Sequence, residues 1–155
     1  MASELKVDTV SEKTTGNGVT IDSVTLKDGA VVGAALTDYV ETDVALTSTS
    51  GVIAIDLANG NTGSITLSEN ITDIDFTNVP TNGTSSFTLK VTQDGTGSRT
   101  MAINAITVNG GGNVTGLTPG AAGLTLSTGA ADIDLVSFLF FDASTPLINS
   151  LLDFS

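Results

Sequence analysis

Apolar and polar residues alternate along most of the chain after residue 50. In the run FTLKVTQ (87–93), Phe87, Leu89 and Val91 occupy every second position, with threonine or lysine between them. A period of two residues places the apolar side chains on one face of a β-strand and the polar ones on the other. The same alternation is centred on Ile53 and Ile55, Ile65 and Leu67, Ile74 and Phe76, Met101 and Ile103, Ile106 and Val108, and Leu124 and Leu126.

These runs predict an all-β fold. Turn sequences rich in Gly, Asn and Asp separate them, such as ANGNTG (58–63), TNGT (81–84) and DGTGS (94–98). About eight strands at a spacing of roughly 8–12 residues are typical of a β-sandwich or a jelly-roll-like domain. No segment has a sustained helical period. One helical turn is expected at most, in the segment GAALTDYVETDVAL (33–46).

The first 33 residues are patterned differently. Alternating pieces of three residues, VTI (19–21) and VTL (24–26), lie between the turn signals GNG, DS and DG. A two-stranded hairpin is marginally stable in water, and strands this short have too little apolar face to bury each other. We therefore expect an extended N-terminal arm of short strands (1–33), a connector (34–46), and a β-sandwich domain (47–155) that folds without the arm. The arm side chains expected to bury against a partner are Leu5, Val7, Val10, Val19, Ile21, Val24 and Leu26.

The run LVSFLFF (135–141) is apolar on both faces of its predicted strand. Val136, Phe138 and Phe140 would share one face, and a strand that is apolar on both sides is normally buried on both. A second covering layer is therefore expected over the other face, supplied by the connector, by the C-terminal tail LINSLLDF (147–154), or by a neighbouring subunit. We favour the neighbour. The residues expected to be covered there are Leu135, Leu139 and Phe141.

Composition and charge narrow the classes of partner. The 155 residues suffice for one ordinary domain with an appendage. The chain has 17 acidic residues and only 5 basic ones, which gives a net charge of -12. So few scattered cations cannot form the patch that binds nucleic acid or an anionic membrane surface, so we expect neither partner. Ser and Thr supply about a quarter of the chain, which suits either burial against other subunits or a stable domain with few charges.

Catalytic and metal-binding chemistry is hard to build from this sequence. The chain has no His and no Cys, so the commonest bases, nucleophiles and soft metal ligands are missing. Asp73 with Asp75, and Asp132 with Asp134, are carboxylate pairs at i, i+2 spacing on predicted strands. Such pairs resemble glycosidase acids or part of a calcium site. The simpler interpretation, which we favour, is that both pairs face water while the intervening isoleucines face the core. We predict no catalytic site, no metal and no cofactor.

Two stretches of the chain resemble structural proteins of tailed bacteriophages, especially phages of marine bacteria. LKVDTVSEKTTGNGVTIDSVTLKDG (5–29) is similar to a module that occurs next to fibre-like segments, except that Ser23 stands where Gly is usual. The segment 45–101, with IDL (55–57) and SFTLKVTQD (86–94), is similar to a β domain of tail-fibre and other virion proteins. The aromatic-rich ending usual in those proteins is replaced here by LINSLLDF (147–154).

The resemblance implies a virion component without enzymatic activity. With room for one arm and one sandwich, a capsid decoration (cement) protein or short head spike fits the size better than a long fibre. It would be made in the host cytoplasm, form a homotrimer and bind the major capsid protein on the outer capsid surface. Two other classes stay open: a short tail fibre that recognises a host surface glycan, and a hydrolase that uses one of the carboxylate pairs.

Overall fold

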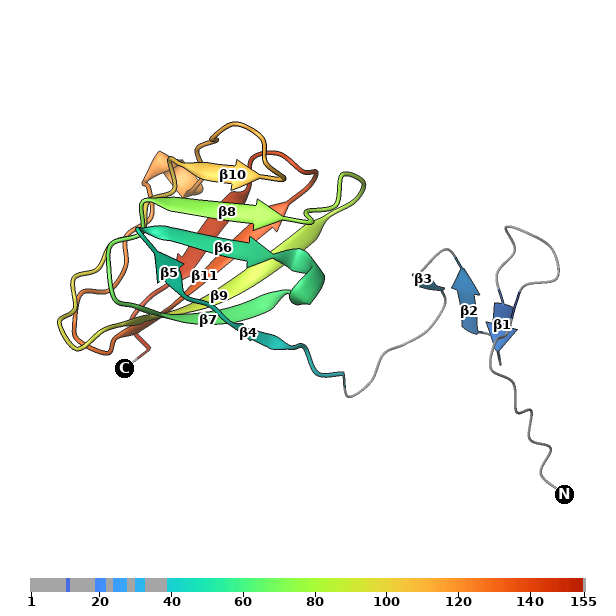
Figure 1. The fold of residues 1–155 in the computed structure, drawn as a ribbon, viewed down its shortest axis with the longest axis horizontal. Helices are drawn as coiled ribbons and strands as arrows, with labels where there is room; N and C mark the ends of the chain where they lie inside the picture. Colours follow the sequence, from blue (N-terminus) through green and yellow to red (C-terminus); the bar gives the residue numbers. More distant parts are fainter. Residues whose placement is uncertain (1–10, 12–18, 22–23, 28–29, 33–38, 155) are drawn as a thin grey trace, which may run out of the picture. The chain divides into compact units, whose positions relative to one another are not determined.

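The chain divides into two compact units, residues 1–40 and 41–155. The computed structural model describes residue 11 and residues 19–21, 24–27, 30–32 and 39–154 (Figure 1). The predicted arm positions Leu5, Val7 and Val10 lie outside the described residues. The predicted helical turn falls partly on residues 33–38, which also lie outside them.

The first unit contains a three-stranded antiparallel sheet. Its strands are β1 (Val19–Ile21), β2 (Val24–Lys27) and β3 (Ala30–Val32), in the order β1-β2-β3. The first two are the predicted short strands, paired with Ile21 opposite Val24. The third strand extends the arm's sheet beyond the predicted hairpin. In the sequence, the dipeptide DS lies between the first two strands and DG between the second and the third.

The second unit is built from two stacked sheets (Figure 1). The four-stranded sheet has the order β10-β8-β6-β5, and the five-stranded sheet has the order β12-β11-β9-β7-β4. The strands are β4 (Asp43–Ala45), β5 (Ser48–Thr49), β6 (Val52–Asp56), β7 (Thr62–Leu67), β8 (Asp73–Thr77), β9 (Ser85–Gln93), β10 (Ile106–Val108), β11 (Ile133–Phe140) and β12 (Leu147–Leu151). Two 3-10 helical turns, η1 (Leu57–Asn59) and η2 (Pro119–Ala121), lie in connections. The all-β prediction is confirmed.

The path of the chain explains an unexpected pairing pattern. From β6 to β11, each strand lies in the sheet opposite to the strand before it. Strands two apart in the chain therefore become neighbours, and β6–β8, β8–β10 and β7–β9 are parallel pairs. Only β9–β11, β11–β12 and β5–β6 are antiparallel in this unit. In addition, Asp43–Ala45 of the predicted connector forms β4, which pairs parallel to β7.

The core lies between the two sheets and is centred on Phe76. Its ring contacts Phe138 and Phe140 edge-on, with ring centroids 5.1 and 5.0 Å apart, and Phe87 at 6.3 Å. All four rings are fully buried. This geometry is favoured by the aromatic quadrupole and adds to the burial of apolar area. The inward residues predicted from the alternation are buried here, including Ile53, Ile55, Ile65, Leu67, Ile74, Leu89, Val91, Ile106 and Val136.

One prediction about the carboxylate pairs is wrong. Asp134 does not face water but is only 1% exposed, because it shares the inward face of β11 with Val136 and Phe138. Ile133, expected inside, is half-buried on the outer face. The Asp134 carboxylate accepts hydrogen bonds from the Ser127 amide (2.8 Å), the Ser127 hydroxyl (2.7 Å) and the Asp153 amide (3.0 Å). These donors satisfy the buried charge, which would otherwise be costly.

Candidate interaction surface

The outer faces of the two sheets differ in charge. On the four-stranded sheet, Asp56, Asp73 and Asp75 occupy outward positions of β6 and β8. On the five-stranded sheet, the outward positions of β7, β9, β11 and β12 contain no Asp or Glu, and Lys90 is the one charged residue among them. Since successive residues of a strand face opposite sides, this asymmetry follows from the register of each strand. The edge strand β4 adds Asp43, whose carboxylate accepts a hydrogen bond from Ser64 on this face. The part of the five-stranded sheet better suited to close contact is therefore the one formed by β9, β11 and β12.

Half of this outer face is apolar. Strands β11 and β12 pair with Leu135 opposite Leu151, Ser137 opposite Asn149, and Leu139 opposite Leu147. We call these six outward residues the leucine block: four leucines around one polar pair. Leu147 is 42% exposed and Leu151 58% exposed, and the other two leucines are half-buried. The block is thus a small apolar surface that remains in contact with solvent.

Leu117 extends the leucine block beyond the edge of the sheet. Its amide donates to the Pro146 carbonyl (2.9 Å), and its carbonyl accepts from the Ile148 amide (2.7 Å), which sets it beside Leu147. Its side chain is 55% exposed. The close approach requires glycine at position 116, because a Cβ there would overlap the Ile148 side chain. Next to the block lies a hollow of about 490 Å³, lined by Leu117, Thr118, Pro119, Ser137, Leu139, Leu147, Ile148 and Asn149.

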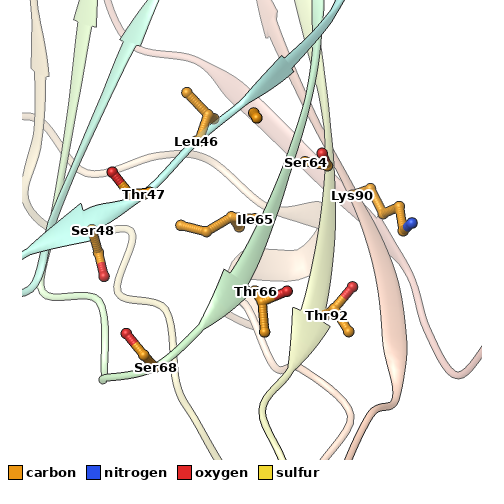
Figure 2. Close-up of a pocket in the computed structure, with 10 residues that line it drawn as sticks. Leu46, Thr47, Ser48, Ser64, Ile65, Thr66, Ser68, Lys90 and Thr92 are labelled. Carbon is orange, nitrogen blue, oxygen red and sulfur yellow. The ribbon is translucent and has the colours of Figure 1, made fainter.

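The other half of the face is rich in hydroxyl groups. A hollow of about 550 Å³ lies over β7 and β9, and Figure 2 shows the side chains around it. Ser64 and Thr66 come from β7, Thr92 comes from β9, and Thr47 and Ser48 come from the segment around β5. These groups donate and accept hydrogen bonds. The Ser64 hydroxyl itself donates to Asp43 Oδ2 at 2.8 Å.

Lys90 also lines this hollow, but its ammonium group is directed elsewhere. In Figure 2 the side chain extends from β9 on the side away from Thr47 and Ser48. Its cross-strand neighbours are Ser64 on β7 and Leu135 on β11. Lys90 therefore stands at the boundary between the hydroxyl half and the leucine block. The arrangement does not form a focused site for an anion.

The predicted second covered face corresponds in part to the outer face of β11. Leu135 and Leu139 lie on the outer face of β11, as predicted, and both are half-buried. Phe141 follows the end of β11 and is 64% exposed, outside the leucine block. The tail does not lie over this face: β12 extends the sheet as an edge strand, and the Phe154 amide donates to the Ile133 carbonyl at 2.9 Å. Within the described part of this unit, the leucine block has no covering layer.

The remaining carboxylates act as local caps and surface charges. The Asn78 amide (2.7 Å) and the Ala58 backbone amide (2.9 Å) hold the pKa of Asp56 below its usual value, because both donate to the ionised form. Asp73 and Asp75 are half-exposed around the buried Ile74, as predicted, and Asp73 Oδ1 has no hydrogen-bond partner. The described residues contain no group of three or more Asp or Glu side chains able to hold a metal ion.

Sequence reasoning missed much of this surface. The alternation in LINSL (147–151) was available as a signal, since Leu147, Asn149 and Leu151 occupy every second position. Leu117 gave no such signal, because it belongs to a single bridge outside any strand.

Comparison with known protein families, curated proteins and solved structures finds no match to this chain. Among the described residues, none of the helical segments has the length and apolar character needed to cross a membrane.

Proposed function

We propose that this chain is a non-enzymatic virion structural protein: a capsid decoration protein or short head spike that binds the outer shell as a trimer and stabilises it. The observation that carries the proposal is the outer face of the five-stranded sheet, where the outward positions of β9, β11 and β12 include no carboxylate and the leucine block is exposed, in a chain of net charge -12. Exposed apolar patches on soluble proteins commonly mark interaction sites. The resemblance of residues 5–29 and 45–101 to phage virion modules supports the same assignment.

The parts of the chain suit this role in different ways. The core of the two-sheet unit packs four phenylalanine rings, and its acidic four-stranded face suits exposure to solvent. The arm supplies an attachment element, with apolar residues at Val19, Ile21, Val24 and Leu26. Full burial of one such side chain is worth about 1.5–3 kcal/mol, so four of them together contribute a gain of the same order as the cost of ordering and association. The major capsid protein is the proposed partner, on the outer capsid surface.

A binding test with matched variants examines this role. Ile21→Asp with Leu26→Asp should abolish co-sedimentation of the protein with capsids, whereas Thr20→Asp with Thr25→Asp should leave it nearly unchanged. Both pairs add the same charge to β1 and β2, but only the first removes apolar side chains. Cryo-microscopy of decorated particles would locate the protein. Binding of the first variant at wild-type occupancy would refute the arm as the anchor, and absence of any capsid binding by the wild-type protein would refute the proposed function.

A second candidate function is recognition of a host surface glycan by a short tail fibre. The hydroxyl-lined hollow over β7 and β9 favours it, because Ser and Thr side chains can hydrogen-bond to sugar hydroxyls. A glycan array probed with the purified protein tests this alternative. Signal that is lost in Thr66→Ala with Thr92→Ala would support it over shell decoration.

A further inference from the structure

We propose that the leucine block and Leu117 form the surface through which copies of this chain pack against one another, each block facing the same block of its neighbours around a symmetry axis. This inference rests on the trimer of the proposed function and names the surface through which its copies would meet. The occupant is a second copy of this chain, and three observations argue for that choice.

The first observation is the distribution of charge. Any two copies carry 17 acidic and 5 basic residues each, so they repel unless they meet where carboxylates are missing. The outward positions of β9, β11 and β12 have none, whereas the outer face of the four-stranded sheet has Asp56, Asp73 and Asp75. Contact between like copies is therefore favoured at the five-stranded face. A strongly basic partner would instead select the acidic face.

The second observation is the chemistry of the polar pair in the block. Asn149 and Ser137 lie opposite each other, and leucines flank both of them along their strands. A neutral amide carries donors and an acceptor, so Asn149 can hydrogen-bond to the same residue of another copy. A carboxylate or an ammonium group at this position could not do so. A polar residue in an apolar contact also sets register and the number of copies, as asparagine does in coiled coils.

The third observation is the shape and extent of the surface. The block spans about 13 Å along β11, from Leu135 to Leu139, at roughly 3.3 Å per residue. The hollow beside Leu117 and Leu147 gives a protruding side chain of a neighbour a place to insert. A stable contact needs about 800 Å² from each partner, so the adjoining Ser86 and Thr88 of β9 must also be covered, with the ammonium group of Lys90 left at the rim of the contact. Ser86 and Thr88 there lose little on desolvation compared with charged groups.

Disulfide crosslinking tests the proposal directly, because the chain has no native cysteine. In the full-length protein, Asn149→Cys should give a disulfide-linked dimer on a non-reducing gel after mild oxidation at low micromolar concentration. If three copies meet at the axis, at most two of every three chains can be linked. The control is Ala54→Cys, an exposed position on the outer face of the four-stranded sheet, which should stay monomeric on the gel. Equal crosslinking of the two variants would overturn the proposal.

Light scattering gives a second, independent readout. The wild-type protein should have the molar mass of an oligomer, and Leu147→Asp with Leu151→Asp should reduce it to that of a monomer. Phe141→Asp, an equally exposed substitution outside the block, should leave the oligomer intact. The measurement should cover about 10–100 µM, the range of the Kd of weak complexes. A wild-type protein that is monomeric throughout this range would overturn the inference. An oligomer that survives the leucine substitutions would also overturn it.

The outcome is separable from that of the proposed function. Crosslinking at Asn149 without binding to capsids would uphold the contact surface and refute shell decoration. Binding to capsids by a protein that shows no specific crosslinking at Asn149 would uphold shell decoration and refute the contact surface.

Discussion

Replacing Asp134 with alanine tests how the end of β11 is held. The carboxylate is buried and accepts three hydrogen bonds, two from Ser127 and one from the Asp153 amide. It thereby joins three segments: the strand β11, the loop before it and the C-terminal tail. Alanine at this position would leave three donors without an acceptor in a site that water reaches poorly.

The expected cost follows from these contacts. Hydrogen bonds to a charged group contribute about 1.5–3 kcal/mol each. The sum is offset by the desolvation of the carboxylate in the wild type, so we expect a net loss of about 3–5 kcal/mol in the free energy of unfolding, at the upper end of what single substitutions cost when they break a buried hydrogen-bond network. For a chain of this size that corresponds to a decrease in Tm of roughly 10–15 °C.

The measurement is urea unfolding followed by circular dichroism, with calorimetry for Tm. Asp75→Ala is the matched control, because Asp75 is a half-exposed strand carboxylate without a hydrogen-bond partner in the described part of the chain. It should change stability by less than about 0.5 kcal/mol. Hydrogen exchange of the Ser127 and Asp153 amides should accelerate in Asp134→Ala. A loss of stability no larger than that of Asp75→Ala would refute the reasoning.

Three further outcomes are expected. A protein reduced to residues 41–155 should keep its β circular dichroism and melt cooperatively; loss of both would mean that the arm belongs to the core. Gly63→Ala should cost about 1–3 kcal/mol in urea unfolding, because its Cβ would lie 2.8 Å from the Phe87 ring; wild-type stability would contradict the packing. The side-chain hydrogen bond from Arg99 holds the pKa of Asp94 below its model-compound value of 3.8. The stability that this hydrogen bond contributes is therefore present above pH 3.8 and lost on acidification below it. Asp94→Asn should make the free energy of unfolding less dependent on pH in the acid range. An unchanged pH dependence would count against a stabilising role of the Arg99–Asp94 pair.

The sequence by itself determined which side chains face the core of most strands. Phe87, Leu89 and Val91 are buried as their alternation predicts, and Ile74 is buried between two half-exposed aspartates. This information is local, because the two-residue period of a strand assigns a face without reference to any neighbour. The all-β class follows from the same periodicity together with the turn residues. The candidate surface was predicted in part, through the apolar outer face of β11.

Only the tertiary structure decided which strands are neighbours. The parallel pairing of β7 with β9 depends on the chain entering the opposite sheet between them, and no local pattern records that path. Asp134 is a second example: its burial depends on donors from Ser127 and Asp153, which the fold brings to the end of β11. Alternation alone assigned it wrongly.

The leucine block arises for the same reason. Leu147 and Leu151 belong to this surface because β12 pairs with β11 in a register that puts them opposite Leu139 and Leu135. A shift of one residue would turn both leucines to the inner face and bring Ile148 outward. The periodicity of a strand is set by its own backbone. Its partner and register are set by the long-range burial of apolar side chains, which only the folded chain establishes.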